Sequence, residues 1–494
     1  MSHRGLPRRN RRAIGGGPRL ILMLALWVAM PAWAGGAALP VVPGPTDADR
    51  VQARELIEQL IRLQTAKGHG QVPVLAELLS QRFRDAGFAA GDIQIVPVDS
   101  DVDTTAALIM RYPGRARSTL RPVAILGHMD VVGAVASNWS VDPFVPVEKD
   151  GYLYGRGSVD NKAQVALVAT TFIRLRRAGW VPERDLVLAL SGDEESGSQT
   201  TQLLTRHPWV KSAEFALNAD SGTGDMDADG SNKAFYIQAA EKTSVSYKVD
   251  TRNSGGHSSV PRPDNALYDM AVAIRALQAL RFPVQFNEIN RAMVTELVAK
   301  RGGDLGRAFQ ALLDDPHDAA ARAVVEQSPE DAHVLWTTCV PTMIEGGNAR
   351  NALPQNASLT VHCRIFPGTS PESVGETLAA AVAPANAEVS IDAARVSSPA
   401  SPIHPALFAA VRKAVDANYP GATLTPQMSS GGTDGRYFRI AGIPTYGVGS
   451  LVQVDPDDDR AHGIDERVRL DSFMRELDFW DVLLKDIAGP RSHP

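Results

Sequence analysis

The chain has 494 residues, of which 44% are hydrophobic, and a formal net charge of −6 at pH 7. A chain of this length and apolar content can bury a large core, and we expect two domains rather than one. The acidic balance excludes the broad basic field on which nucleic-acid binding usually depends, so no nucleic-acid partner is expected.

Residues 1–34 have the layout of a secretory signal peptide. Arginines between Arg4 and Arg19 precede the apolar run "LILMLALWVAM" and the small-residue ending "PAWAGG". Because the run is shorter than the roughly 20 residues of a membrane-spanning helix, we predict cleavage after Ala34 and a periplasmic or secreted protein with no stable membrane span. The alternative is a membrane-anchored protein with an uncleaved signal. The Pro-rich residues 35–50 are predicted to be a linker.

After the linker, helical and strand-like patterns alternate. Helical periodicity covers residues 51–65, 72–87 and 161–179, and apolar strand-like runs cover residues 92–98, 106–112, 122–130, 184–192 and 213–222. Near-continuous apolar strands between helices indicate a mostly parallel sheet with helices on both faces. We therefore predict an α/β catalytic domain that begins with residues 51–241.

A different pattern of polar and apolar residues begins near residue 242. A polar and apolar alternation is followed by a helical run, an irregular polar stretch, two strands, a helix and a short strand; these cover residues 242–251, 265–280, 281–331, 339–347, 357–367, 370–382 and 387–393. The order β-α-β-β-α-β predicts a ferredoxin-like module over residues 242–398. The α/β pattern then resumes over residues 399–494, so the module is expected to interrupt the catalytic domain.

Polar residues stand just after the apolar runs, where ligands bind in open α/β sheets. Three such runs, "VAILGHMD", "LALSGDEE" and "FALNAD", end in acids, and the first also contains a histidine. The segment "GSVDNK" starts a predicted helix, and "RAHGIDERV" lies near the C-terminus. The candidate residues are His128, Asp130, Asp160, Glu194, Glu195, Asp220 and His462.

Adjacent carboxylates repel one another, but a divalent cation among them makes their proximity favourable. Two imidazoles and several carboxylates suit zinc and similar metals. We predict two ions, with His128 on one, His462 on the other and Asp160 as a bridge. Asp220 and Glu195 would complete the two sets of ligands.

Two acids remain for other roles. Glu194, beside Glu195, is free to act as a general base on a metal-bound water. Asp130 stands two residues from His128 and is placed to accept its other ring N–H, which fixes the tautomer. Each motif alone has an ordinary structural explanation, but the combination, in this order and at element ends, points to a metal centre.

The motifs "GHMDVV", "GRGSVDNK", "GDEESGS", "NADSG", "GGHSS", "EGGNARNALP", "SGGTDGRYF" and "HGIDERV" together resemble those of the M20 metallopeptidase family, which includes carboxypeptidases, aminoacylases and deacylases. The resemblance spans about Val51 to Leu484. It implies two zinc ions, with cobalt or manganese as alternatives, on the same ligands: His128 and Asp220 on one, Glu195 and His462 on the other, with Asp160 bridging and Glu194 as base.

The resemblance also assigns residues that the sequence pattern alone leaves open. His257 would otherwise be read as a turn histidine, but in the family it stabilises the oxyanion, in dimeric members from the partner subunit. Asn351, Arg364, Gly432 and Thr433 match substrate-contacting positions.

Two features depart from the family pattern. His362 stands where an acid often precedes the arginine, and residues 281–331 are longer than in compact members. The resemblance also implies a possible homodimer through the inserted module. The two departures weaken both this expectation and the assignment of Arg364 to the substrate.

Cys339 and Cys363 fall on the two strands that flank "EGGNARNALP". A cross-strand disulfide and two buried free thiols are both open, because spacing alone does not decide between them.

The leading hypothesis is an exported dizinc hydrolase that cleaves a peptide or amide C–N bond of small peptides or N-acyl amino acids, as a carboxypeptidase or dipeptidase does. The alternative within the same site is an N-acyl-amino-acid deacylase. A non-catalytic binding protein on the same fold is a third reading, although no ligand and no base is missing from the sequence.

Overall fold

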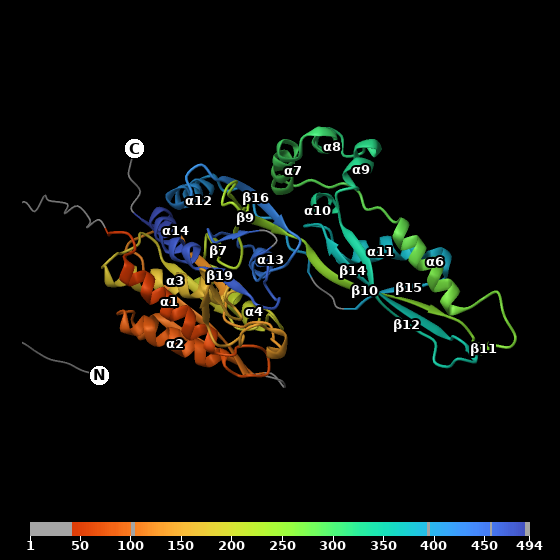
Figure 1. Ribbon diagram of the computed structural model, residues 1–494, viewed down its shortest axis with the longest axis horizontal. Helices are drawn as coiled ribbons and strands as arrows, with labels where there is room; N and C mark the ends of the chain where they lie inside the picture. The colour runs from red at the N-terminus through yellow and green to blue at the C-terminus, as the bar shows by residue number, and fades with distance from the viewer. Residues whose placement is uncertain (1–41, 100–103, 393–395, 455–456, 490–494) are drawn as a thin grey trace, which may run out of the picture. The chain divides into compact units, whose positions relative to one another are not determined.

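The computed structural model describes residues 42–99, 104–392, 396–454 and 457–489 (Figure 1). The predicted signal peptide lies outside these ranges. Helix α1 (Asp47–Arg62) begins four residues before the predicted start at Val51, so residues 47–50 are not a linker. The Thr46 side chain accepts from the Asp49 N–H, and the Asp49 side chain accepts from the Thr46 N–H. This capping box explains the early start. Among the helices of the described ranges, none is long and apolar enough to cross a membrane.

A ten-stranded sheet forms the larger part of the fold. Its main path is β1 (Ile93–Asp99), β2 (Thr104–Tyr112), β6 (Leu186–Ser191), β3 (Val123–His128), β7 (Phe215–Asn218), β17 (Thr445–Gly447), β9 (Ala234–Glu241), β8 (Gly224–Met226) and β18 (Val452–Val454). β16 (Thr423–Ser429) pairs with β9 in parallel. The central strands β6, β3, β7 and β17 are parallel, whereas β1 and β2 are antiparallel. β3, β6 and β7 are buried throughout, which explains their unbroken apolar runs.

Helices cover both faces of this sheet, as predicted. Alternate residues of β2 show the division: Leu108 and Met110 belong to one apolar cluster, and Ala107 and Ile109 to another. The first cluster includes α1, α2 (Val72–Asp85), α3 (Lys162–Arg177), α12 (Pro405–Asn418) and α14 (Leu470–Ala488). The second includes α4 (Gln199–Arg206), α5 (Pro208–Lys211) and α13 (Gly435–Ile440).

A separate four-stranded sheet carries the predicted β-α-β-β-α-β order. Its strand order is β12 (Thr338–Gly346), β14 (Asn356–Ile365), β10 (Thr243–Arg252) and β15 (Glu388–Ile391), and every pair is antiparallel. Helices α6 (Ala266–Ala279) and α11 (Pro371–Val382) cover its apolar face, where Tyr247 and Val361 are fully buried. The α/β fold class with a ferredoxin-like module is therefore confirmed.

The prediction of an irregular stretch over residues 281–331 is wrong. The structure has α7 (Glu288–Arg301), α8 (Gly303–Asp314), α9 (Ala319–Val325) and α10 (Pro329–Ala332) there. In α7 the polar Asn290 is buried together with Ile289 and Val294, so the buried face has no purely apolar repeat, and Gly302 separates α7 from α8. Buried Ile289 and Phe309 join the apolar cluster of the large sheet, and the Met428 N–H donates to Met293 Sδ at 2.9 Å.

Two smaller sheets complete the described strands. β19 (Arg467–Arg469), β5 (Tyr152–Tyr154) and β4 (Val147–Lys149) form one, and β11 (Gly256–His257) and β13 (Ala352–Leu353) form the other.

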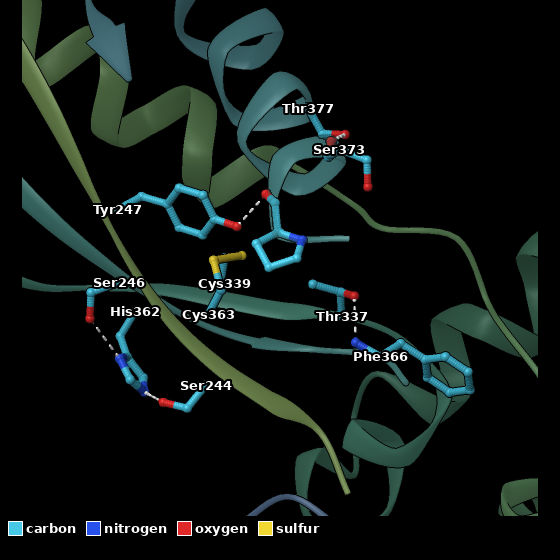
Figure 2. The surroundings of a disulfide bond; sticks show 11 residues. Ser244, Ser246, Tyr247, Thr337, Cys339, His362, Cys363, Phe366, Ser373 and Thr377 are labelled. Atoms are coloured by element: carbon cyan, nitrogen blue, oxygen red, sulfur yellow. Dashed lines mark hydrogen bonds between the residues drawn. A yellow bond between two sulfur atoms is a disulfide. The ribbon is translucent and has the colours of Figure 1, made fainter. Parts of the chain in front are cut away.

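Cys339 and Cys363 form a disulfide, which decides between the two alternatives left open by the sequence (Figure 2). The two residues lie opposite each other in the antiparallel pair β12–β14, with Cα atoms 4.1 Å apart. On the same sheet His362 is hydrogen-bonded to Ser244 and Ser246 (Figure 2).

Candidate active site

The ends of three neighbouring strands bring the predicted ligands together. His128 is the last residue of β3, which pairs in parallel with β6 on one side and β7 on the other. Glu195 follows β6, and Asp220 follows β7. Because parallel strands end at the same edge of a sheet, the three side chains converge there.

Asp160 lies between the two predicted histidines. Its Oδ1 is 2.8 Å from His128 Nε2, and its Oδ2 is 3.1 Å from His462 Nε2. Asp220 Oδ1 lies 3.3 Å from His128 Nε2, and Glu195 Oε1 lies 2.8 Å from His462 Nε2. Potential ligand atoms of His128, Asp160 and Glu195 all lie within 4.8 Å of one another. The structure thus brings all five predicted ligands into one cluster.

Asp130 has more contacts than its predicted one. His128 Nδ1 is 3.0 Å from the Asp130 carbonyl oxygen and 3.6 Å from the carboxylate Oδ1, so the carbonyl is the nearer acceptor. The carboxylate accepts the backbone N–H groups of Glu194 at 3.1 Å and Glu195 at 3.0 Å. Asp130 therefore holds both His128 and the turn that carries the two glutamates.

The electrostatics of the cluster fit a divalent cation. Burial, followed by the negative charge of Asp434, raises the pKa of Glu194 to about 9. Burial also raises the pKa of Asp220 to about 7, with Asp160 adding to the shift. Hydrogen bonds to Asp160 and Glu195 raise the pKa of His462 to about 10. Crowded carboxylates that retain protons are relieved by positive charge, and imidazole with carboxylate is a donor set for zinc, cobalt or manganese.

Asp434 is a neighbour of this cluster that the sequence analysis missed. It is 4% exposed and accepts hydrogen bonds from the hydroxyls of Ser191, at the end of β6, and Thr201. Its position in "SGGTDG", next to a predicted substrate-contacting residue, was the available signal.

Gly432 and Thr433 lie in different environments. Gly432 is exposed, and a Cβ there would come within 2.9 Å of Arg436 Nη1. Thr433 is buried: its N–H donates to Glu241 at 2.6 Å, and its hydroxyl accepts from Asn218 at 3.0 Å. The Thr433 side chain is thus engaged within the protein.

The remaining predicted residues fall into two groups. His257 on β11 and Asn351 are adjacent, because the Ser258 N–H donates to the Asn351 carbonyl at 3.1 Å and His257 pairs with Ala352 on β13. Arg364 Nη1 donates to the carbonyl of Ser430 at 3.1 Å, in the loop that leads to Gly432.

His257 has a defined tautomer. The Ser259 N–H donates to His257 Nδ1 at 3.2 Å, and the Ser259 hydroxyl lies 2.7 Å from the same atom. Because a backbone N–H can only donate, Nδ1 is an acceptor and Nε2 carries the proton. The His257 side chain is exposed, so this N–H is available to a ligand.

Two histidines that share one carboxylate, beside the strand ends of an α/β sheet, form the arrangement expected of a metallohydrolase. The model of peptidase family M20/M25/M40 matches residues 124–486, and the chain belongs to this family.

Curated relatives include N-fatty-acyl-amino acid synthase/hydrolase PM20D1 of Homo sapiens, which is 25% identical over 74% of each chain. Aminoacylase-1 of Homo sapiens is 22% identical over 89% of this chain and 96% of its own.

Solved structures show the same fold. An M20 family metallo-carboxypeptidase from Sulfolobus solfataricus matches with a TM-score of 0.65 at 16% identity, over 88% of this chain and 98% of that one. A dinuclear metal-binding M20 peptidase from Bacillus subtilis matches with a TM-score of 0.56 at 11% identity, over 90% and 99%.

Proposed function

We propose that this chain is an exported dinuclear metallohydrolase that cleaves the C–N bond of small peptides or N-acyl amino acids. The observation that carries the proposal is the position of Asp160, whose two carboxylate oxygens each contact a different histidine, His128 or His462. A carboxylate that offers one oxygen to each of two imidazoles suits a bridge between two ions.

His128 and Asp220 would hold one ion, Glu195 and His462 the other, and Asp160 both. Zinc is the metal proposed, with cobalt and manganese as the alternatives that metal analysis distinguishes. When bound, such ions polarise a scissile carbonyl and lower the pKa of a water molecule.

Glu194 would move the proton in the reaction. It lies beside the ligand Glu195, and Asp130 holds the backbone N–H groups of both glutamates. Burial raises its pKa to about 9, which supports a role for this carboxyl as a proton acceptor. Glu194 would accept a proton from the attacking water and deliver it to the leaving nitrogen.

His257, Asn351 and Arg364 would contact the substrate. The Nε2–H of His257 is free of Ser259 and can donate to the oxyanion that develops on the carbonyl. The guanidinium fork of Arg364 suits a substrate carboxylate. Gly432 and Thr433 would shape the neighbouring loop.

An N-acyl-amino-acid deacylase is the second candidate. The names of two relatives favour it, N-fatty-acyl-amino acid synthase/hydrolase PM20D1 and aminoacylase-1. A panel of dipeptides, tripeptides and N-acyl amino acids of increasing chain length separates the two candidates by kcat/KM.

Export is supported by the signal-like residues 1–34 and by the Cys339–Cys363 disulfide, because disulfides persist in oxidising compartments. Mass analysis of protein recovered from a cell fraction tests it. A mature chain that starts at residue 35 is expected in the periplasm or medium, whereas the full-length chain in the membrane fraction indicates an uncleaved anchor.

A homodimer through the inserted module is also proposed. β12 is an edge strand of the small sheet, and Val340, Met343 and Ile344 on it are 56–61% exposed. An antiparallel edge can pair with a second copy of itself about a two-fold axis. Light scattering of the wild type and of Ile344→Glu tests this: the variant should be a monomer with unchanged metal content.

The replacement Glu194→Ala tests the hydrolase itself. Hydrolysis of every substrate in the panel should vanish, while the metal content measured by mass spectrometry stays at the wild-type value. The exposed Glu55→Ala, on α1, is the matched control and should retain activity. A wild-type protein that binds metal but hydrolyses no amide would instead identify a binding protein.

A further inference from the structure

A buried ion pair between Arg156 and Glu466 lies directly behind the candidate ligands. Arg156 Nη1 is 2.6 Å from Glu466 Oε2, and the two side chains are 3% and 0% exposed. The cost of taking two charges out of water can exceed their mutual attraction, so such a pair is weak evidence for stability. The proposed reaction uses neither residue, and the contacts of the pair suggest another role.

The Glu466 carboxylate organises the segment that carries Asp160. Its Oε2 accepts the Gly157 N–H at 3.0 Å, and its Oε1 accepts the N–H groups of Val159 at 2.8 Å and Asp160 at 3.0 Å. The Glu466 carbonyl also accepts the Gly155 N–H at 3.0 Å. The backbone that leads to Asp160 is thus wrapped around a single carboxylate.

Arg156 holds the segment that carries His462. Its Nη2 donates to the carbonyls of His462 at 3.3 Å and Gly463 at 2.9 Å, and its guanidinium lies 5.1 Å from the centre of the Trp139 ring. His462 has a φ of 63°, in the left-handed region that is unfavourable for a residue with a Cβ. The loop therefore needs contacts such as these to keep its shape.

The geometry points to Arg156 and Glu466 as positioning residues that set the spacing between Asp160 and His462, and with it the affinity of the metal site completed by His462. The inference rests on the proposed dinuclear centre. His128 and Asp220 are held by β3 and by the residues after β7, outside these contacts. The pair should therefore act on the ion of His462 and Glu195 more than on the ion of His128 and Asp220.

Two variants test the inference by zinc titration of the metal-free protein against a chelator. Glu466→Gln keeps the size of the side chain but turns an amide toward backbone donors. Arg156→Lys keeps the charge but loses the fork that reaches both Glu466 and the carbonyls. In each, the binding step that His462→Ala removes should lose roughly 10- to 100-fold in affinity, as expected for partners behind metal ligands. The other step should change by a smaller factor, because that site shares Asp160 with the contacts of the pair but does not include His462.

Asp481→Asn is the matched control, because it breaks the buried Arg174–Asp481 pair, whose side chains are 7% and 6% exposed. Arg174 lies about 18 Å along α3 from its first residue, Lys162, at about 1.5 Å per residue. This variant should lower the Tm of the metal-free protein and leave both zinc affinities unchanged.

Three results would overturn the inference. Glu466→Gln and Arg156→Lys could lower only the Tm, as the control does, which makes the pair structural. They could weaken both binding steps equally, which removes the selectivity for the His462 site. If the wild type itself binds no second zinc ion, the proposed dinuclear centre fails, and the inference fails with it.

Discussion

Glu195 Oε1 lies 2.8 Å from His462 Nε2, although 267 residues separate the two in the chain. Glu195 follows β6 of the large sheet, whereas His462 lies in the loop before β19. Their contact joins the part of the large-sheet fold before the inserted module to the part after it. The proposed site of Glu195 and His462 therefore forms only when both of these parts of the fold are in place.

Replacement of His462 by Ala should remove one ion and leave the other. The affinity for the ion held by His462 and Glu195 should fall by more than about 100-fold. A loss of about 100-fold is the largest expected when only a residue behind a ligand is replaced, and His462 is itself a proposed ligand. Metal content after gel filtration measures this. His69→Ala is the control, because His69 is exposed and contacts Gln64 at 2.9 Å. Loss of both ions from His462→Ala would contradict two separable sites.

Replacement of His257 by Ala should slow catalysis without loss of metal. Removal of one oxyanion donor lowers kcat by about 100- to 1,000-fold in comparable sites. Steady-state kinetics and metal analysis on the same preparation measure the two quantities. Ser259→Ala leaves the backbone N–H that fixes the tautomer, so its kcat should stay much closer to that of the wild type. Equal kcat for His257→Ala and wild type would exclude the oxyanion role.

Reduction of the Cys339–Cys363 disulfide should destabilise the inserted module. The two cysteines are 24 residues apart, and closure of a loop of this length contributes about 3.5 kcal/mol in the chain-entropy model. Urea unfolding with and without a reductant measures the difference. The double replacement of both cysteines by Ser should be insensitive to the reductant. A wild type that unfolds identically under both conditions would show that the crosslink does not contribute.

Glu476 should make stability depend on pH. It is 0% exposed on α14 and accepts from the Ser450 N–H at 2.7 Å and from Gln164 at 3.1 Å; burial raises its pKa from 4.5 to about 7. Between these two values the folded protein keeps a proton that the unfolded chain releases. The contribution of the group is therefore greatest below the unfolded pKa and is lost as the pH rises through the folded one.

The loss amounts to about 3 kcal/mol, at about 1.4 kcal/mol for each unit of pKa. Glu476→Gln does not titrate, so the free energy of unfolding of the variant should rise relative to that of the wild type by this amount between about pH 4 and pH 8. Chemical denaturation at both pH values measures it. A difference that is the same at both would contradict the assignment.

Much of the fold was predictable from local pattern. The unbroken apolar runs that became β3, β6 and β7 indicated strands buried on both faces, and the structure places them at the centre of the large sheet. The order of elements also predicted the small antiparallel sheet. The pattern failed for α7 to α10, where Gly302 divides α7 from α8 and the buried face of α7 includes the polar Asn290.

The candidate ligands were predictable because the physics of a parallel sheet ties chemistry to strand ends. His128, Glu195 and Asp220 each stand just after an apolar run, so a one-dimensional pattern was enough to select them. The hydrogen bonds from the N–H groups of Glu194 and Glu195 to the Asp130 carboxylate had no such signal, because the donors belong to the backbone of a turn elsewhere in the chain.

The sequence by itself determined the alternation of buried strands and helices and the set of side chains that suit a metal, since both follow from the chemistry of neighbouring residues. Only the tertiary structure decided that Cys339 and Cys363 pair, that Asp434 lies near Glu194, and that Glu466 holds Asp160 across 306 residues. The physical reason is that these contacts depend on which loops meet when the core closes, and a lone acid or cysteine carries no local pattern that names its partner.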